Sequence, residues 1–295
     1  MRNRKPGEII FDSINYVILT LFMVICIYPF YYVLIYSLSD PKTVQRGVYF
    51  LPVDLTLFNF SRIFSIDILY TGVYISILRT AIGAFVTLFS CMFFAYILLS
   101  NEMPFRKIIY RFVIITMYIS GGLIPYYLTI RAYGLRNSFL VYIIPTAISA
   151  FYIILFKTFM EQLPPALEES AKIDGAGVFT VFIKIIFPLS TPIVATVIVF
   201  SAVGQWNSWF DTYIFITNKS LYTLQYILLN FLRESEQLAQ SMRSSGSTAS
   251  VQIQVLTSES VKMTITVIVL IPILLVYPFM QRYFIKGIML GAIKG

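Results

Sequence analysis

Histidine is absent from this sequence of 295 residues, cysteine occurs twice, and charged residues make up only 12%. Without histidine the chain has no imidazole for a proton relay, a metal site or Ser-His catalysis. Cys26 and Cys91 both lie in apolar segments, and no CxxC motif is present, so neither a disulfide framework nor a metal cluster is indicated. We therefore expect a chain that is not an enzyme and binds no metal.

A phosphate-binding loop of the GxxxxGK[ST] type is also missing. The glycine pairs at Gly121-Gly122 and at 287–291 are not followed by Lys-Ser or Lys-Thr. The sequence therefore predicts no cofactor on this chain. If ATP drives the protein, the nucleotide and its Mg²⁺ must be bound by another subunit.

Apolar residues are abundant: they make up 58% of the chain, and the mean hydropathy is +0.80. This is too much apolar surface for one soluble core. A membrane span needs about 20 mainly apolar residues. Segments of this kind are predicted at 14–38, 71–99, 108–129, 138–160, 187–217 and 260–284. We therefore expect an all-α membrane protein with six transmembrane helices.

The ends of the spans suggest how the chain is oriented. The first span is too long for a signal-peptide core, so we expect it to be retained, with 1–13 as a short cytoplasmic tail. Six spans would place both termini in the cytoplasm, and the basic residues support this orientation modestly. The net charge of +8 is scattered over span ends, which indicates contact with the lipid bilayer and not with nucleic acid.

A polar island at 163–184, LPPALEESAKIDGAGVFTVFIK, separates two apolar segments. Pro164-Pro165 at its start and Glu168-Glu169 in the following turn favour a short helix, because proline and acidic residues suit a helix start. Gly175 is placed to end that helix without a side-chain clash. Small Ser170 and Ala171 would permit close docking against a partner.

The spacing within the island carries further information. Glu169-Ser170-Ala171 is followed after three residues by Gly175, after nine more by Ile185, and then by Pro188. This resembles the EAA loop of bacterial ABC importer permeases, Glu-Ala-Ala-x3-Gly-x9-Ile-x-Leu-Pro, with departures at Ser170 and Phe187. The resemblance implies that 163–186 is a cytoplasmic loop whose helix docks in a groove of an ATPase and transmits its closure. The residues implied in this coupling are Glu168, Glu169, Ser170, Ala171, Asp174, Gly175, Ile185 and Pro188.

Other segments resemble one branch of this family. They are TMYISGGLIPYYLTI at 116–130, VGQWNSWFD at 203–211, SESVKM at 258–263, and the tail segments 277–287 and 291–295. The branch is related to maltose-type sugar permeases and is closest to the Lpl-type, alginate and pectin-fragment permeases. Membership implies the type I permease fold over a single domain, 1–295, with 285–295 as a cytoplasmic tail.

The same resemblance implies an assembly. Its other parts would be a second homologous permease, two cytoplasmic ATPase subunits that hold ATP and Mg²⁺, and an extracellular or periplasmic sugar-binding protein. An oligosaccharide or polysaccharide fragment would be the substrate. The alternative is an ion-coupled secondary transporter without an ATPase. The absence of a convincing internal repeat and of histidine, and the small number of intramembrane acids, disfavour it.

Polar residues inside the spans indicate a substrate pathway. Gln205, Ser208, Trp209 and Thr212 fall at i, i+3, i+4 and i+7, which would place them on one face of a helix. Aromatic rings and amides are the side chains that bind sugars. The alternative is packing between helices, with the tryptophans in an interfacial belt. The candidate pathway residues are Gln205, Ser208, Trp209, Thr212, Asn207, Gly121 and Gly122, the last two because they interrupt the third span.

Two charged residues and one polar segment stay open. Arg79 in the second span is expected to extend towards the outer headgroups, although Asp211 could also pair with it or contact the binding protein. The Ser- and Gln-rich segment 235–260 is predicted to be a polar loop outside the membrane, either flexible or a docking surface.

Overall fold

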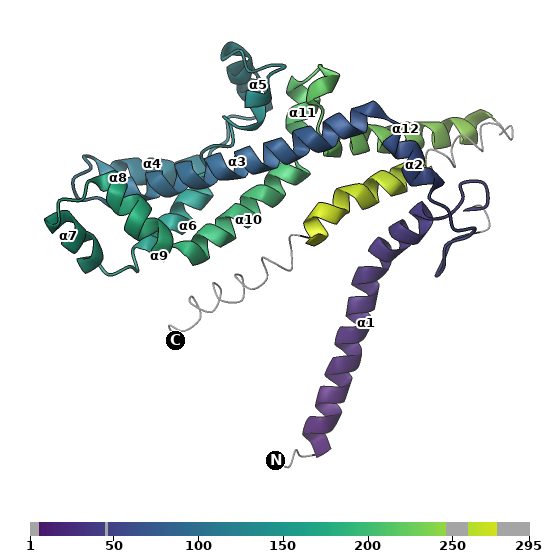
Figure 1. Ribbon diagram of the computed structural model, residues 1–295, viewed down its shortest axis with the longest axis horizontal. Helices are drawn as coiled ribbons and strands as arrows, with labels where there is room; N and C mark the ends of the chain where they lie inside the picture. Colours follow the sequence, from purple (N-terminus) through teal and green to yellow (C-terminus); the bar gives the residue numbers. More distant parts are fainter. Residues whose placement is uncertain (1–5, 45–46, 246–258, 276–295) are drawn as a thin grey trace. The chain divides into compact units, whose positions relative to one another are not determined.

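The computed structural model describes residues 6–44, 47–245 and 259–275 (Figure 1). Within these ranges the regular structure is helical, with one isolated β-bridge between Ser39 and Leu55. The chain divides into two compact units, Met1–Ile66 with Leu228–Ile271, and Asp67–Ile227 with Pro272–Gly295. The predicted tail 285–295, the segments 277–287 and 291–295, and the end of the span 260–284 lie outside the described residues.

The first unit contains α1 (Pro6–Ser37), α2 (Phe58–Phe64), most of α12 (Leu224–Ser245) and most of a helix over 259–275. α1 is long and apolar, and most of its side chains are exposed, as expected of a helix that faces lipid. Its end is fixed by polar contacts: Asn59 Nδ2 donates to the carbonyls of Ser37 and Ser39, both at 2.9 Å. Tyr36 Oη donates to Glu259 Oε2 at 3.1 Å, which ties α1 to the helix over 259–275.

The second unit is built around α3 (Asp67–Leu99), against which α6 and α10 pack (Figure 1). Its core combines buried residues of these helices with Phe182, whose ring contacts that of Phe93 at a centroid distance of 5.1 Å. The other elements are α4 (Arg106–Tyr118), α5 (Leu123–Ala132), η2 (Phe139–Tyr142), α6 (Ala150–Met160), α7 (Ala166–Ile173), α8 (Val178–Val181), the π-helix η3 (Phe182–Ile186), α9 (Phe187–Leu189), α10 (Thr191–Asn207), α11 (Phe210–Phe215), η4 (Lys219–Leu221) and the start of α12 (Leu224–Ser245).

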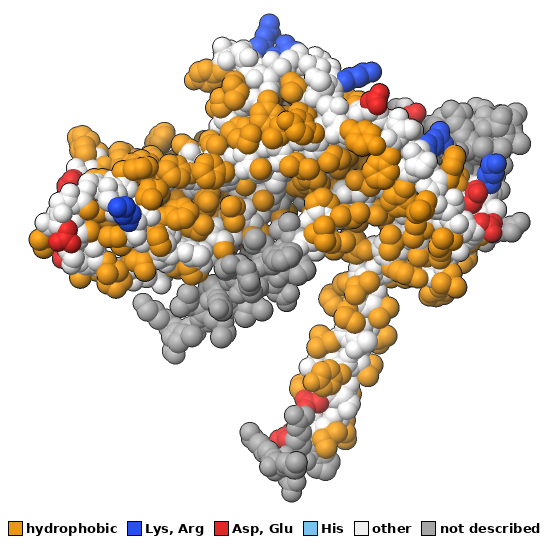
Figure 2. Space-filling model, in the orientation of Figure 1, with side chains coloured by type: hydrophobic (Ala, Val, Ile, Leu, Met, Phe, Trp, Pro, Cys, Tyr) orange, Lys and Arg blue, Asp and Glu red, His pale blue; other side chains and the backbone are white. Residues whose placement is uncertain are grey.

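Two described helices, Gly7–Ser37 and Asp67–Leu99, are long and apolar enough to cross a membrane, or up to four spans if each of two bent pairs is one. Figure 2 shows hydrophobic side chains over much of the visible surface of both units, which suits a lipid environment. The sequence therefore predicted membrane helices correctly.

Three predicted spans are not continuous helices. The span 108–129 is α4 and α5, bent by 119° at a break where Gly122 has φ +79°. The span 187–217 contains a bend of 85° between the helices Val178–Leu189 and Thr191–Asn207, and its helix is interrupted again before α11. In 138–160 the α-helix covers only Ala150–Met160. The interruption at Gly121-Gly122 was expected from the sequence and is confirmed. The other breaks were not predicted, because an apolar run indicates burial in lipid but not the direction of the helix.

The predicted polar loop 235–260 is also partly wrong. α12 runs from Leu224 to Ser245, so the first part of the segment is helical. Residues 246–258 lie outside the described part of the chain. Glutamate, glutamine and leucine in this segment are good helix formers, and their propensity outweighs the serines.

Candidate functional sites: a coupling helix and a polar cavity

The polar island forms the short helix α7, as the sequence predicts. Pro165 is its N-cap residue, Glu168 and Glu169 lie in its first turn, and Asp174 is its C-cap residue. None of the helix residues is buried. Ile185 lies in the π-helix η3 and Pro188 in α9, so both continue the chain from α7 towards α10.

Gly175 ends α7 through its backbone conformation. Its φ is +83°, and the amides of Gly175 and Ala176 donate to the carbonyls of Lys172 at 3.0 Å and Ala171 at 2.9 Å. This pair of bonds is a Schellman motif, which places its glycine in the left-handed region. A Cβ on Gly175 would meet nothing within 4 Å. The expectation that glycine avoids a side-chain clash is therefore corrected: the dihedral angle, and not space, requires it.

α7 presents different residues to its two sides. Ala171 packs against the core cluster of the second unit. Ile173, at 86% exposure, projects away from it, and Glu169 is also exposed. A large apolar side chain this exposed on a polar helix suits contact with another protein.

Ionic contacts connect α7 to the neighbouring α3–α4 segment. Lys172 Nζ lies 3.1 Å from Glu168 Oε1 and 3.5 Å from Glu102 Oε1. The hydrogen bond that Lys172 donates to Glu168, together with the negative charges of Glu168 and Glu102, raises the pKa of Lys172 above its ordinary value. When a lysine has a higher pKa in the folded chain than in the unfolded chain, its protonation stabilises the fold at any pH below the unfolded pKa. That stabilisation is lost as the pH rises through the folded pKa. The pair is therefore intact at neutral pH.

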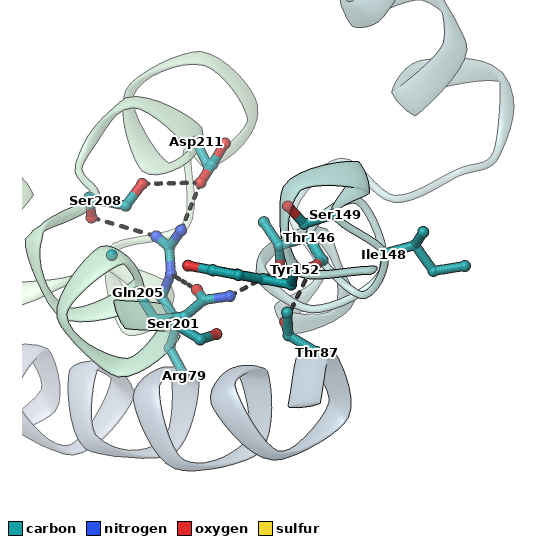
Figure 3. Close-up of a pocket in the computed structure, with 11 residues that line it drawn as sticks. Arg79, Thr87, Thr146, Ile148, Ser149, Tyr152, Ser201, Gln205, Ser208 and Asp211 are labelled. Carbon is teal, nitrogen blue, oxygen red and sulfur yellow. Dashed lines mark hydrogen bonds and ion pairs between the residues drawn. The ribbon is translucent and has the colours of Figure 1, made fainter. Parts of the chain in front are cut away.

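A second site is a cavity of about 330 Å³ in the second unit. Figure 3 shows that its side chains come from α3, the segment before α6, α6, α10 and the α10–α11 junction, and that Ile148 points away from the others. Most of the residues that line it are of polar type: Arg79, Thr87, Thr146, Ile148, Ser149, Tyr152, Ser201, Gly204, Gln205, Ser208 and Asp211.

Arg79 organises one wall of the cavity. Its guanidinium donates from Nε to Gln205 Oε1 at 2.9 Å, from Nη1 to the Ser208 carbonyl at 3.3 Å, and from Nη2 to Asp211 Oδ2 at 2.5 Å (Figure 3). Its Cζ also lies 4.5 Å from the centroid of the Tyr142 ring. The side chain is 1% exposed, so the expectation that it extends to the headgroups is wrong. The open alternative, a pair with Asp211, is confirmed.

Gln205 occupies space that a glycine leaves free. Its Nε2 donates to Thr146 Oγ1 at 2.8 Å, which joins α10 to the segment before α6. A Cβ on Gly83 of α3 would lie 2.7 Å from the Gln205 amide. A side chain at position 83 would therefore displace the Gln205 amide from its hydrogen bonds with Arg79 and Thr146.

The pathway candidates do not share one helical face. α10 ends at Asn207 and Ser208 has ψ 125°, so the i, i+3, i+4, i+7 pattern crosses a break. Gln205 and Ser208 line the cavity, whereas Asn207, Trp209, Thr212, Gly121 and Gly122 are not among its lining residues.

The remaining candidates have other contacts. Thr212 is buried and lies 3.0 Å from both Tyr142 Oη and Thr223 Oγ1. The Trp209 ring contacts Phe210 and Tyr213, and Asn207 Oδ1 accepts from Gln225. These contacts favour helix packing for the three residues, while a role in a pathway stays a prediction.

Tyr152, Ser149 and Ser201 line the cavity and were missed by the sequence analysis. In the described part of the chain their side-chain oxygens have no protein hydrogen-bond partner. Ser201 precedes Gln205 by one helical turn, so extending the polar stripe backwards would have found it. A tyrosine ring beside available hydroxyls and an amide is an arrangement that can hold a sugar.

The structure has helices apolar enough to cross a membrane, an exposed loop helix and a polar cavity among the helices. These features together are those of a membrane transport subunit. Residues 92–289 match the family of binding-protein-dependent transport system inner membrane components, so the chain belongs to this family. It is thus an integral protein of the cytoplasmic membrane and a permease component of an ABC importer.

Individual relatives cover the whole chain. The polygalacturonan/rhamnogalacturonan transport system permease protein YtcP of Bacillus subtilis (strain 168) is 36% identical over 100% of both chains. Protein LplC of the same organism is 36% identical over 100% of this chain and 98% of its own. A crystal structure of a bacterial ABC transporter involved in the import of the acidic polysaccharide alginate contains a similar chain, with a TM-score of 0.84 and 27% sequence identity. The match covers 96% of the present chain and 100% of that chain.

Proposed function

We propose that this protein is the permease subunit of an ATP-driven importer of oligosaccharides or polysaccharide fragments, working by alternating access. The observation that carries the proposal is full-length similarity to a polygalacturonan/rhamnogalacturonan permease, together with the fold shared with an alginate importer chain. The cavity supports it, because its tyrosine, amide and hydroxyls suit a sugar.

The topology follows from this assignment. Six spans over a single domain would place 1–13, 163–186 and 285–295 in the cytoplasm. α7 would then face the ATPase, with Ile173 and Glu169 at the contact. The other candidate residues of this segment would support that contact or connect it to the membrane helices: Glu168, Ser170, Ala171, Asp174, Gly175, Ile185 and Pro188.

The complete transporter would contain a second homologous permease, two cytoplasmic ATPase subunits and an extracellular or periplasmic sugar-binding protein. ATP and Mg²⁺ would bind to the ATPase subunits, and this chain would carry neither nucleotide nor catalytic residues. The charges of Arg79 and Asp211 are paired with each other. The cavity therefore suits hydroxyl recognition, and much of the choice of sugar would be made by the binding protein.

Uptake of labelled oligogalacturonides by cells with and without this chain tests the proposal. We expect uptake to be lost on deletion, restored by the intact gene and abolished by ATP depletion. Uptake that survives ATP depletion but stops when ion gradients collapse would contradict the proposal and favour the ion-coupled alternative.

Ser201→Leu is expected to reduce uptake roughly tenfold, equivalent to about 1.4 kcal/mol, while leaving assembly normal. The larger apolar side chain would fill part of the cavity and remove a hydroxyl from its wall. Val203→Leu, on the same helix but outside the lining, is the matched control and should transport normally. Equal transport by both variants would show that the cavity is not on the substrate route.

A further inference from the structure

α7 is held to α3 by a small set of polar contacts. Tyr96 of α3 donates through its hydroxyl to Glu168 Oε1 at 3.4 Å. Beyond the end of α3, Glu102 accepts from Lys172 at 3.5 Å, and Lys172 also pairs with Glu168. The contacts from α3 and from the segment after it therefore meet on one side of α7.

The two ends of the Tyr96 contact differ in their surroundings. Tyr96 is 3% exposed, and its ring lies 5.5 Å from that of Phe182 in the core of the second unit. Glu168 lies on a helix without buried residues. A cavity of about 50 Å³, lined by both residues and by Pro164 and Pro165, separates the start of α7 from the helices beneath. Within α7 itself only the partly buried Ala171 contacts the core cluster, so a shift of α7 disturbs little of the core, whereas Tyr96 cannot move unless α3 moves with it.

α3 also reaches the polar cavity. Arg79 lies about five turns before Tyr96 on the same helix. It donates to Gln205, the Ser208 carbonyl and Asp211 at the α10–α11 junction. Thr87, between Arg79 and Tyr96, donates to the Thr146 carbonyl at 2.9 Å. One continuous helix thus contacts the coupling helix near one end and the cavity wall further along.

We propose that Tyr96 and Lys172 are positioning residues that transmit movement of α7 through α3 to the cavity. The inference rests on the proposed function, because the movement starts with closure of the ATPase subunits. The competing route is the covalent one, from α7 through Gly175 and Gly177 into α8 and the π-helix. In that case the side-chain contacts to α3 would only hold α7 in place.

The test measures whether ATP changes access to the cavity in the purified, complete transporter. Ser201→Cys provides a reporter of nearly unchanged size on the cavity wall. Cys26, which is exposed, is replaced by serine, whereas Cys91 is buried and stays. The rate of reaction with a charged maleimide is compared with and without ATP and vanadate. In the protein that carries only the reporter cysteine, we expect ATP and vanadate to change the labelling rate about fivefold or more. About fivefold is the lower end of the usual range of coupling between distant sites.

Tyr96→Phe with Lys172→Met is added to the reporter. Phenylalanine keeps the buried ring and removes only the hydroxyl, and methionine keeps the length of Lys172 but not its charge. The ATP-dependent change should fall to near none, with normal amounts of assembled complex and bound ATPase. Tyr74→Phe with Lys184→Met, both exposed residues of the same types, is the control and should keep the full change.

A full fivefold response in the Tyr96→Phe, Lys172→Met variant would overturn the inference and assign transmission to the covalent route. Failure of the proposed function has a different signature: the reporter chain would purify without an ATPase and would not respond to ATP at all.

Discussion

Asp211→Ala is expected to destabilise the protein by about 3–5 kcal/mol, the usual effect of removing one partner of a buried ion pair. Arg79 is 1% exposed and Asp211 14%, so the remaining guanidinium would be a buried charge without its carboxylate partner. In a membrane protein such a loss should appear as a much smaller yield of folded chain. Thermal unfolding of the purified transporter in mild detergent measures it.

Two variants show whether the buried charge is the cause. Arg79→Met combined with Asp211→Ala removes both charges and should recover much of the stability, because an apolar replacement of a buried pair is often tolerated. Glu161→Ala removes the partner of Lys157 from a pair whose carboxylate is 48% exposed, and it should cost less than about 1 kcal/mol. Wild-type stability of Asp211→Ala would show that the pair contributes little.

Gly175→Val should nearly abolish coupled transport while leaving insertion in the membrane intact. A residue with a Cβ in the left-handed region costs about 1–2 kcal/mol, and valine is branched at that carbon. The Schellman motif would therefore open and the end of α7 would change direction. Because α7 has no buried residues, the membrane helices should still fold.

Gly177→Val is the matched control for this prediction. Gly177 has φ −71°, and a Cβ there would meet nothing within 4 Å, so valine is tolerated by the backbone and by the space. Gly175→Asn should retain part of the activity, since asparagine enters the left-handed region more readily. The measurement is ATP-dependent uptake per assembled complex. Equal uptake by the two valine variants would mean that the direction of α7 is not critical.

The helix α7 could be predicted almost to the residue because its signals are local. Two prolines, two acidic residues and one glycine specify its start, its first turn and its end within 163–175. The resemblance of its residue spacing to the EAA loop then predicted a role in coupling to an ATPase. What sequence could not give was the reason for Gly175, because whether space or a dihedral angle requires glycine depends on the surrounding chain.

The polar cavity could be predicted only in part, because its walls come from distant segments. Gln205 and Ser208 were found from a stripe on one span, but Tyr152 belongs to another helix with no visible pattern. Arg79 and Asp211 are 132 residues apart, so sequence left their pairing open. The break at Ser208 contains neither glycine nor proline, and the assumption of one helical face therefore failed.

The central claim is that this chain works as the permease of an ATP-driven transporter. The most direct test is to purify the tagged protein from its native membrane in mild detergent and to identify and quantify the chains that accompany it by mass spectrometry. Recovery of a second permease and of an ATPase with a Walker motif, at two ATPase copies per permease pair, is the predicted result. A stable chain that purifies alone, without ATPase activity in the preparation, would contradict the account.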